Sequence, residues 1–220
     1  MIFKFLTILP IIWLQLLVEY DAFTYYAFRQ EWIPGSCSGA SCSPVPENVT
    51  SWTLHGLWPS GKDRNPFYCK RSATFKKEPI EPLLPELKTK WPSTNPKNPN
   101  TDFWKHEWLK HGTCATSFDS EYKYFKNALE LHDKYDIFKF LKTSGITPKE
   151  NELYKLQDFS QAIKKSINNK TINLFCKNIK NYNHQLIISL NICLDKNFEP
   201  IDCPNKKGCR FSDLLYLPFK

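Results

Sequence analysis

Apolar and polar positions divide the chain into segments with a strand-like or a helix-like period. Aromatic and β-branched residues are concentrated at 23–29 and 51–57, and the strongest strand pattern is 185–194. Because strand patterns lie at both ends of the chain and helical patterns lie between them, we expect an α+β fold: a single domain with a mostly antiparallel sheet flanked by helices. The helical patterns are at 83–91, 101–111, 121–133, 135–143 and 157–168.

The first twenty residues form a separate segment. After Lys4, eleven of the fourteen residues at 5–18 are apolar. This stretch is too short and too interrupted for a membrane span, but it suits the apolar core of a secretory signal. We therefore predict a signal peptide at 1–20, a mature domain at 21–220 and secretion, with a lysosomal or vacuolar compartment as an alternative destination. An uncleaved N-terminal anchor is the other interpretation of this segment.

Composition narrows the class of protein. Hydrophobic residues make up 41% of the sequence and aromatic residues 15%, which is enough for a packed core and excludes a disordered chain, a collagen and a coiled coil. The net charge of +8 favours a polyanionic partner such as nucleic acid, a heparin-like glycan or an acidic membrane. A soluble cationic protein without such a partner fits the charge equally well.

The eight cysteines are expected to be oxidised, because the chain is predicted to be exported. The sequence has no C-x-x-C pair, so neither a zinc ribbon nor a redox motif is expected, and spacing alone leaves the pairing open. Two N-x-[ST] sequons mark Asn48 and Asn169 as glycosylation sites of an exported chain. The cysteines are Cys37, Cys42, Cys69, Cys114, Cys176, Cys193, Cys203 and Cys209.

The residues capable of chemistry are concentrated in two segments, W-T-L-H-G-L-W-P at 52–59 and F-W-K-H-E-W-L-K-H-G-T-C at 103–114. Together they hold three of the five histidines. In a helix at 101–111, Trp104 and Trp108 lie on one side and can anchor it to the core. The other side carries Phe103, His106, Glu107, Lys110 and His111. Such a face can be merely solvated, but two imidazoles beside an ammonium and a carboxylate favour a catalytic cluster.

The His-Glu pair in the second segment raises the possibility of a zinc site. Zinc proteases use H-E-x-x-H, in which the two histidines are four residues apart on one helix face. Here His111 follows His106 by five residues, and Lys110 would place a positive charge beside any cation. Metal binding is therefore disfavoured, and no cofactor is predicted.

Histidines and a lysine without a metal suit phosphoryl chemistry. A neutral histidine removes a proton from the nucleophile, and a protonated histidine delivers one to the leaving oxygen. A lysine offsets the charge that grows on the phosphoryl oxygens. RNA supplies its own nucleophile, the 2′-OH, and its bases can stack on aromatic side chains such as Trp58 and Phe103. We therefore expect single-stranded RNA, rather than DNA or a membrane, as the partner of a monomeric protein.

The two segments strongly resemble the active-site segments of the secreted ribonuclease T2 family, and the tryptophan-rich second segment is more similar to animal members than to plant self-incompatibility members. The resemblance implies an α+β fold and metal-independent cleavage of RNA through 2′,3′-cyclic phosphates. It implies that His55 is the general acid and His111 the general base. Phosphate binding and stabilisation of the transition state are assigned by resemblance to His106, Glu107 and Lys110.

The resemblance extends beyond the two segments. It includes Gln30-x-Trp32, so Gln30 joins Trp58 and Phe103 as a predicted substrate-binding residue. Ile33 departs from the family pattern, in which proline often follows this tryptophan. The disulfides that the resemblance implies are Cys37–Cys42, Cys69–Cys114, Cys176–Cys209 and Cys193–Cys203.

Two other functions are compatible with an exported, basic protein. A secreted histidine phosphatase would need an R-H-G nucleophile motif, but Leu54 precedes His55. The second alternative is a non-enzymatic glycoprotein that binds RNA or cell surfaces in a signalling or cytotoxic role. The intact set of histidines, lysine and glutamate favours the enzyme.

Overall fold

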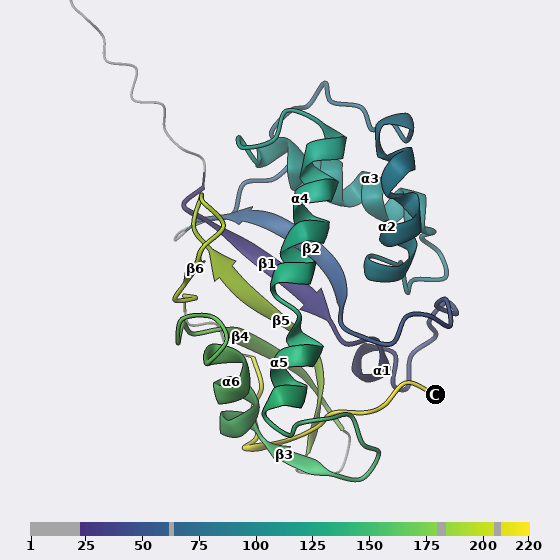
Figure 1. Ribbon diagram of the computed structural model, residues 1–220. Helices are drawn as coiled ribbons and strands as arrows, with labels where there is room; N and C mark the ends of the chain where they lie inside the picture. The colour runs from purple at the N-terminus through teal and green to yellow at the C-terminus, as the bar shows by residue number, and fades with distance from the viewer. Residues whose placement is uncertain (1–22, 62–63, 180–183, 205–207) are drawn as a thin grey trace, which may run out of the picture.

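The computed structural model describes residues 23–61, 64–179, 184–204 and 208–220. The predicted signal peptide at 1–20 lies outside these residues. Within them, no helix is both long enough and apolar enough to cross a membrane. The helices pack around one sheet, which confirms the predicted α+β fold (Figure 1).

The described strands form a sheet centred on β5 (Gln185–Leu194). β1 (Tyr25–Glu31) lies between β5 and the edge strand β2 (Thr53–Ser60), and it is antiparallel to both. β5 runs parallel to β7, so the sheet is mixed although mostly antiparallel. The shorter strands are β3 (Leu153–Lys155), β4 (Asn173–Asn178), β6 (Pro200–Ile201) and β7 (Asp213–Leu215).

Most of the predicted helices are confirmed to within two residues. A 3₁₀ helix at Glu78–Leu83, which was not predicted, precedes α2. It contains Pro79 and Pro82, whose missing amide hydrogens disfavour a regular α-helix. The α-helices are α1 (Ile33–Ser36), α2 (Leu84–Lys90), α3 (Asn100–Lys110), α4 (Glu121–Lys134), α5 (Ile137–Thr143) and α6 (Leu156–Lys164).

The helix predicted at 157–168 is shorter in the structure. α6 ends at Lys164, and the chain turns before it enters β4. Asn168 and Asn169 have φ values of 55° and 58°, in the left-handed region that asparagine tolerates better than most residues. The turn therefore follows from the residue type, although the apolar period of the helix continued through it.

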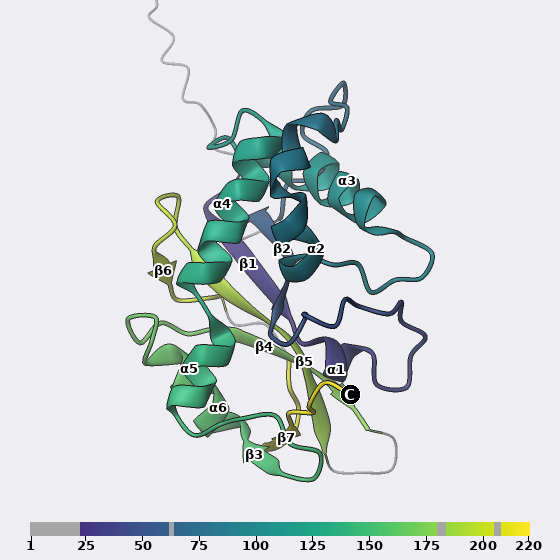
Figure 2. The ribbon, with the colours of Figure 1, turned by 45° about the vertical axis from the view of Figure 1, so that its right-hand side comes forward.

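The core lies between the sheet and the long helix α4. The buried residues of α4 recur on one side of the helix, which the sequence period predicted. Figure 1 shows α4 and α5 crossing one face of the sheet, and Figure 2 shows α2 and α3 near the β2 edge. The buried residues of α4 are Tyr124, Phe125, Ala128, Leu129 and Leu131.

All eight cysteines are paired, in the four disulfides that the family resemblance implied. Cys69–Cys114 ties the loop before α2 to the end of α3, where the candidate chemistry lies. The amide of Tyr68 also donates to the carbonyl of Lys110 at 2.9 Å. The C-terminal end of α3 is therefore held from outside the helix by a covalent bond and a hydrogen bond.

Candidate active site

A β-bulge in β2 sets the direction of His55. On β1, Arg29 pairs with Gly56 and Gln30 pairs with Leu54, so His55 is the extra residue. In a regular strand, residues 55 and 58 would point to opposite faces of the sheet. The bulge re-aims His55, and its ring centroid lies 5.4 Å from that of Trp58. The bulge thus brings the rings of His55 and Trp58 to the same face of the sheet.

Helix α3 carries the second motif and is anchored by tryptophans, as predicted. Trp104 and Trp108 are 1% and 5% exposed, and the indole of Trp104 donates to the carbonyl of Trp91 at 2.8 Å. The helix ends at Lys110, and His111 is its C-cap. A Cβ on Gly112 would lie 2.3 Å from the ring of Trp108, so only glycine allows the chain to leave the helix here.

Trp58 joins β2 to α3 at the centre of the site. Its indole Nε1 donates to Oε2 of Glu107 at 2.7 Å. Its ring is stacked on His111, with centroids 5.1 Å apart and planes at 29°. The guanidinium carbon of Arg29 lies 5.3 Å from the same ring centroid. Trp58 is therefore surrounded by protein groups, and it positions His111 and Glu107 relative to His55.

Glu107 is the most deeply buried carboxyl group of the site, at 1% exposure. Burial raises the pKa of Glu107 to about 7, although the charge of His55, the hydrogen bond from Trp58 and the charges of Lys110 and Arg29 all oppose the shift. Gly56 makes room for this group, because a Cβ there would lie 2.4 Å from Glu107 Oε2. A Cβ at Gly56 would come even closer to the indole nitrogen of Trp58, at 2.0 Å, so the glycine leaves room for both partners of the Trp58–Glu107 hydrogen bond.

The surroundings of His106 and His111 disfavour the charged form of each imidazole. Burial lowers the pKa of His111 to about 3, and the charges of Lys110, His106 and His55 act in the same direction. Partial desolvation and the charge of Lys110 also lower the pKa of His106, although much of its side chain remains exposed. The ring centroids of the two histidines are 6.4 Å apart. A neutral, buried His111 can accept a proton from a group bound beside it.

A cavity of about 290 Å³ opens beside His106, whereas Lys110 and His111 are not among its lining residues. Its walls include His55, Glu107, Phe103 and His106, together with the loop between α2 and α3. The ring of Phe103 stands edge-on to that of His55, with centroids 5.4 Å apart. A phosphodiester placed here would meet imidazole, carboxyl and aromatic groups together.

The family description "Ribonuclease T2 family" matches residues 23–203.

The chain belongs to the ribonuclease T2 family.

Ribonuclease Oy of Magallana gigas is 37% identical over 188 residues, which cover 83% of this chain and 88% of that protein. Ribonuclease T2 of Danio rerio is 35% identical over 196 residues, covering 87% and 78%. Among solved structures, that of RNase NT in complex with 5′-AMP superposes with a TM-score of 0.79 at 30% identity, covering 90% of this chain and 99% of that one. The family resemblance of the two motifs is therefore confirmed.

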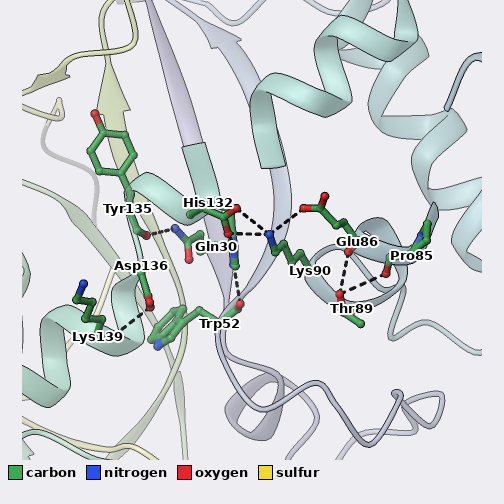
Figure 3. Close-up of polar contacts among 11 residues, drawn as sticks. Gln30, Trp52, Pro85, Glu86, Thr89, Lys90, His132, Tyr135, Asp136 and Lys139 are labelled. Carbon is green, nitrogen blue, oxygen red and sulfur yellow. Dashed lines mark hydrogen bonds and ion pairs between the residues drawn. The ribbon is translucent and has the colours of Figure 1, made fainter. Parts of the chain in front are cut away.

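One predicted residue of this ribonuclease T2 member does not join the cluster. Gln30 is fully buried, and its amide Nε2 donates to the carbonyl of Tyr135 at 2.8 Å (Figure 3). Its neighbour Glu31 lines the cavity instead and lies 3.1 Å from His55. Sequence reasoning missed Glu31 because the strand pattern was ended at residue 29. The available signal was the pair of charged residues on either side of Gln30, which are Arg29 and Glu31.

The i, i+5 spacing of the histidines does not keep them apart in this family member. Because α3 ends before His111, one donor atom each from His106, Glu107 and His111 falls within 4.8 Å of the others. Such a set of nitrogen and oxygen ligands could hold a transition-metal ion. The ion would be bound by His111, the predicted base, and by the predicted phosphate-binding residues His106 and Glu107. Lys110 would lie beside it. The spacing of the histidines therefore does not argue against zinc, and only the charge of Lys110 still disfavours a cation here.

Proposed function

We propose that the protein is a secreted endoribonuclease that cleaves single-stranded RNA by metal-independent transesterification. The observation that carries this proposal is the pair His55 and His111, both in contact with Trp58 but in different electrostatic surroundings. His111 is surrounded by positive groups, whereas His55 contacts a carboxylate. Such a pair is suited to a reaction that needs one base and one acid at the same time.

In the first step, His111 takes the proton of the ribose 2′-OH. The 2′-oxygen then bonds to phosphorus, and the bond from phosphorus to the 5′-oxygen breaks. His55 delivers its proton to that leaving oxygen. The products are a strand ending in a 2′,3′-cyclic phosphate and a strand with a free 5′-OH. Water can open the cyclic phosphate when the two histidines exchange roles.

The remaining polar groups act on the phosphoryl oxygens. Lys110 and His106 supply donors and positive charge where negative charge grows in the transition state. Glu107 is protonated below a pH of about 7, and its Oε2 already accepts a hydrogen bond from Trp58. Its other oxygen can therefore carry the proton and donate to a phosphoryl oxygen. This role predicts better catalysis in mildly acidic solution, as in a lysosome or vacuole.

Two predicted substrate contacts now have different proposed roles. Phe103 lines the cavity and is the aromatic ring placed to stack on a base. Trp58 has His111 against its ring and Glu107 on its nitrogen, so we assign it to holding the catalytic groups rather than to stacking.

Export of the chain is supported by the apolar segment at 5–18 and by the four disulfides. Asn48 and Asn169 are exposed, as glycosylation sites must be. We propose a monomeric, glycosylated protein outside the cytosol, with RNA rather than DNA as its substrate and with no membrane partner.

The test is incubation of the purified mature protein with yeast RNA and with single-stranded DNA, both in EDTA. Cleavage of RNA alone, with 2′,3′-cyclic phosphate ends at short times, supports the proposal. Intact RNA, or 5′-phosphate ends, overturns it. Binding of RNA without cleavage would favour the non-enzymatic alternative.

A further inference from the structure

Glu31 contacts the His55 imidazole at Nδ1. Its Oε2 lies 3.1 Å from Nδ1 of His55, and the two side chains are 21% and 37% exposed. Glu31 is the last residue of β1 and pairs with Thr53, so the strand ladder fixes it beside the bulge that aims His55. The contact is therefore made by two backbone segments that are themselves hydrogen-bonded to each other.

We propose that Glu31 is a positioning residue that orients His55 and stabilises its protonated form. This inference rests on the proposed function, in which His55 is the general acid. It makes β1 part of the catalytic apparatus, although neither active-site motif lies on that strand.

Orientation follows from the donor and acceptor chemistry of the two groups. A carboxylate only accepts hydrogen bonds, so the imidazole nitrogen facing Glu31 must carry a proton. Nδ1–H of His55 then donates to Glu31. The remaining nitrogen, Nε2, is left free for the substrate. It can donate a proton when His55 is charged and accept one when His55 is neutral, as both steps of the reaction require.

The surroundings of His55 already contain positive groups, which disfavour a protonated imidazole. The negative charge of Glu31 acts in the opposite direction. Glu107 is mostly neutral below a pH of about 7, so it offers His55 little negative charge in acid. Burial raises the pKa of Glu31, but the hydrogen bond and charge of His55, together with the charge of Arg29, outweigh burial and leave that pKa below its usual value. Glu31 thus stays ionised where Glu107 does not. The other charged or titratable groups around His55 are Arg29, His106, Lys110 and His111.

Arg29 is a half-buried cation on the same strand as Glu31. It precedes Glu31 by two residues on β1, so both side chains point to the same face of the strand. Its guanidinium carbon lies 4.3 Å from the ring centroid of Phe175, and Nη2 donates to Ser189 Oγ at 3.0 Å. These contacts restrict Arg29, and its charge favours the ionised form of Glu31.

Two substitutions separate charge from orientation. Glu31→Gln removes the charge but keeps an oxygen that can accept from Nδ1–H, whereas Glu31→Ala removes the acceptor as well. In Glu31→Gln we expect the alkaline limb of the kcat profile to move to lower pH and kcat near neutral pH to fall about 10-fold, with KM within about twofold. Glu31→Asp retains the charge and is expected to restore much of the rate. Glu86→Gln, which removes an exposed carboxylate paired with Lys90, is the control.

The second measurement does not depend on activity. Nitrogen-15 NMR of histidine-labelled protein reports which ring nitrogen of neutral His55 carries the proton, with His55→Gln used for assignment. Wild type and Glu31→Gln are expected to show Nδ1–H, and Glu31→Ala is expected to shift toward Nε2–H. The proposal requires both effects: an unmoved alkaline limb in Glu31→Gln, or an unchanged tautomer in Glu31→Ala, overturns it. A change in base preference alone also overturns it. If the tautomer shifts in a protein that does not cleave RNA, only the proposed function fails.

Discussion

The indole nitrogen of Trp58, on an edge strand, donates a 2.7 Å hydrogen bond to the buried carboxyl group of Glu107, on a helix. This bond links the two sequence motifs directly, because Trp58 belongs to the first and Glu107 to the second. It also explains how Glu107 can be buried although it belongs to the polar face of α3. On that face, Glu107 is covered by β2, a strand from an earlier part of the sequence, whereas His106 remains exposed.

Trp58→Phe removes this hydrogen bond while keeping an aromatic ring against His111. Loss of a buried donor costs about 1–3 kcal/mol of stability. We expect urea unfolding to show a loss in this range and kcat to fall more than KM rises, because Glu107 and His111 lose their common support. An unchanged kcat in a folded Trp58→Phe protein would contradict the positioning role of Trp58.

The histidines are expected to differ strongly in their effect on activity. His55→Ala and His111→Ala each remove a proton-transfer group, which typically costs about 10²–10⁴-fold in rate. His106→Ala should retain more activity, because its exposed ring acts only on charge. Rates measured on RNA in EDTA, normalised to folded protein, provide the comparison.

His132 provides the matched control because it lies away from the site. Its Nε2–H donates to the carbonyl of Trp52 at 2.8 Å, close to the Lys90–Asp133 ion pair (Figure 3). His132→Ala should therefore lower the melting temperature but leave the rate per folded molecule near that of wild type. Equal losses of rate at His132 and His55 would show that the active site lies elsewhere.

Glu107 makes the stability of the protein depend on pH. Its folded pKa, about 7, is above the ordinary value of 4.5, so the native state holds the proton more tightly than the unfolded state does. The stability that this provides is present below about pH 4.5 and is lost as the pH rises through about 7. Glu107→Gln abolishes that loss.

We therefore expect the unfolding free energy of Glu107→Gln, relative to wild type, to rise by roughly 3 kcal/mol between about pH 4 and about pH 8. The low pKa of His111 has the opposite sign, but it is present in both proteins and cancels in the difference. Urea unfolding at the two pH values is the measurement. A difference that stays constant with pH would show that folding does not raise the pKa of Glu107.

The long elements could be predicted from the sequence because their apolar periods are local. α4 buries one side of the helix and β5 buries nearly all of its residues, and the predicted bounds differ from the observed ones by at most one residue. The short strands β3, β6 and β7 have only two or three residues each. They exist through pairing with distant strands, and no local pattern of that length specifies a partner.

The site was predictable in its residue types but not in its geometry. The motifs contain His55, Glu107 and His111, yet the bulge that aims His55 is a property of the register between β1 and β2. The same register decides that Glu31, rather than Gln30, faces the cavity. A helical wheel also cannot show that His111 leaves the helix at Gly112, because that depends on the packing of Trp108.

Transition metals are expected to inhibit rather than activate. The converging donors of His106, Glu107 and His111 suit Zn²⁺, and a bound ion would take the lone pair that the base needs. Added Zn²⁺ should lower the rate of RNA cleavage, EDTA should restore it, and Mg²⁺, which prefers oxygen ligands, should have little effect. His106→Ala should weaken the inhibition. Activity that is lost in EDTA and restored by a divalent ion would contradict metal-independent cleavage.

The substrate's own 2′-OH is the predicted nucleophile, so its removal should protect one bond and no other. All eight cysteines are in disulfides, and no protein thiol is available to attack phosphorus. An oligonucleotide with a single 2′-deoxyribose should therefore resist cleavage on the 3′ side of that sugar, while the neighbouring linkages are cut at their usual rates. Because the base must be neutral and the acid charged, the rate should be bell-shaped in pH, and the low pKa of His111 places the acid limb well below the ordinary range of imidazole. Mass spectrometry of the fragments gives both the cleaved linkage and the chemistry of the ends. Cleavage at the deoxy position would require an activated water and would remove His111 from its role as the base that deprotonates the ribose.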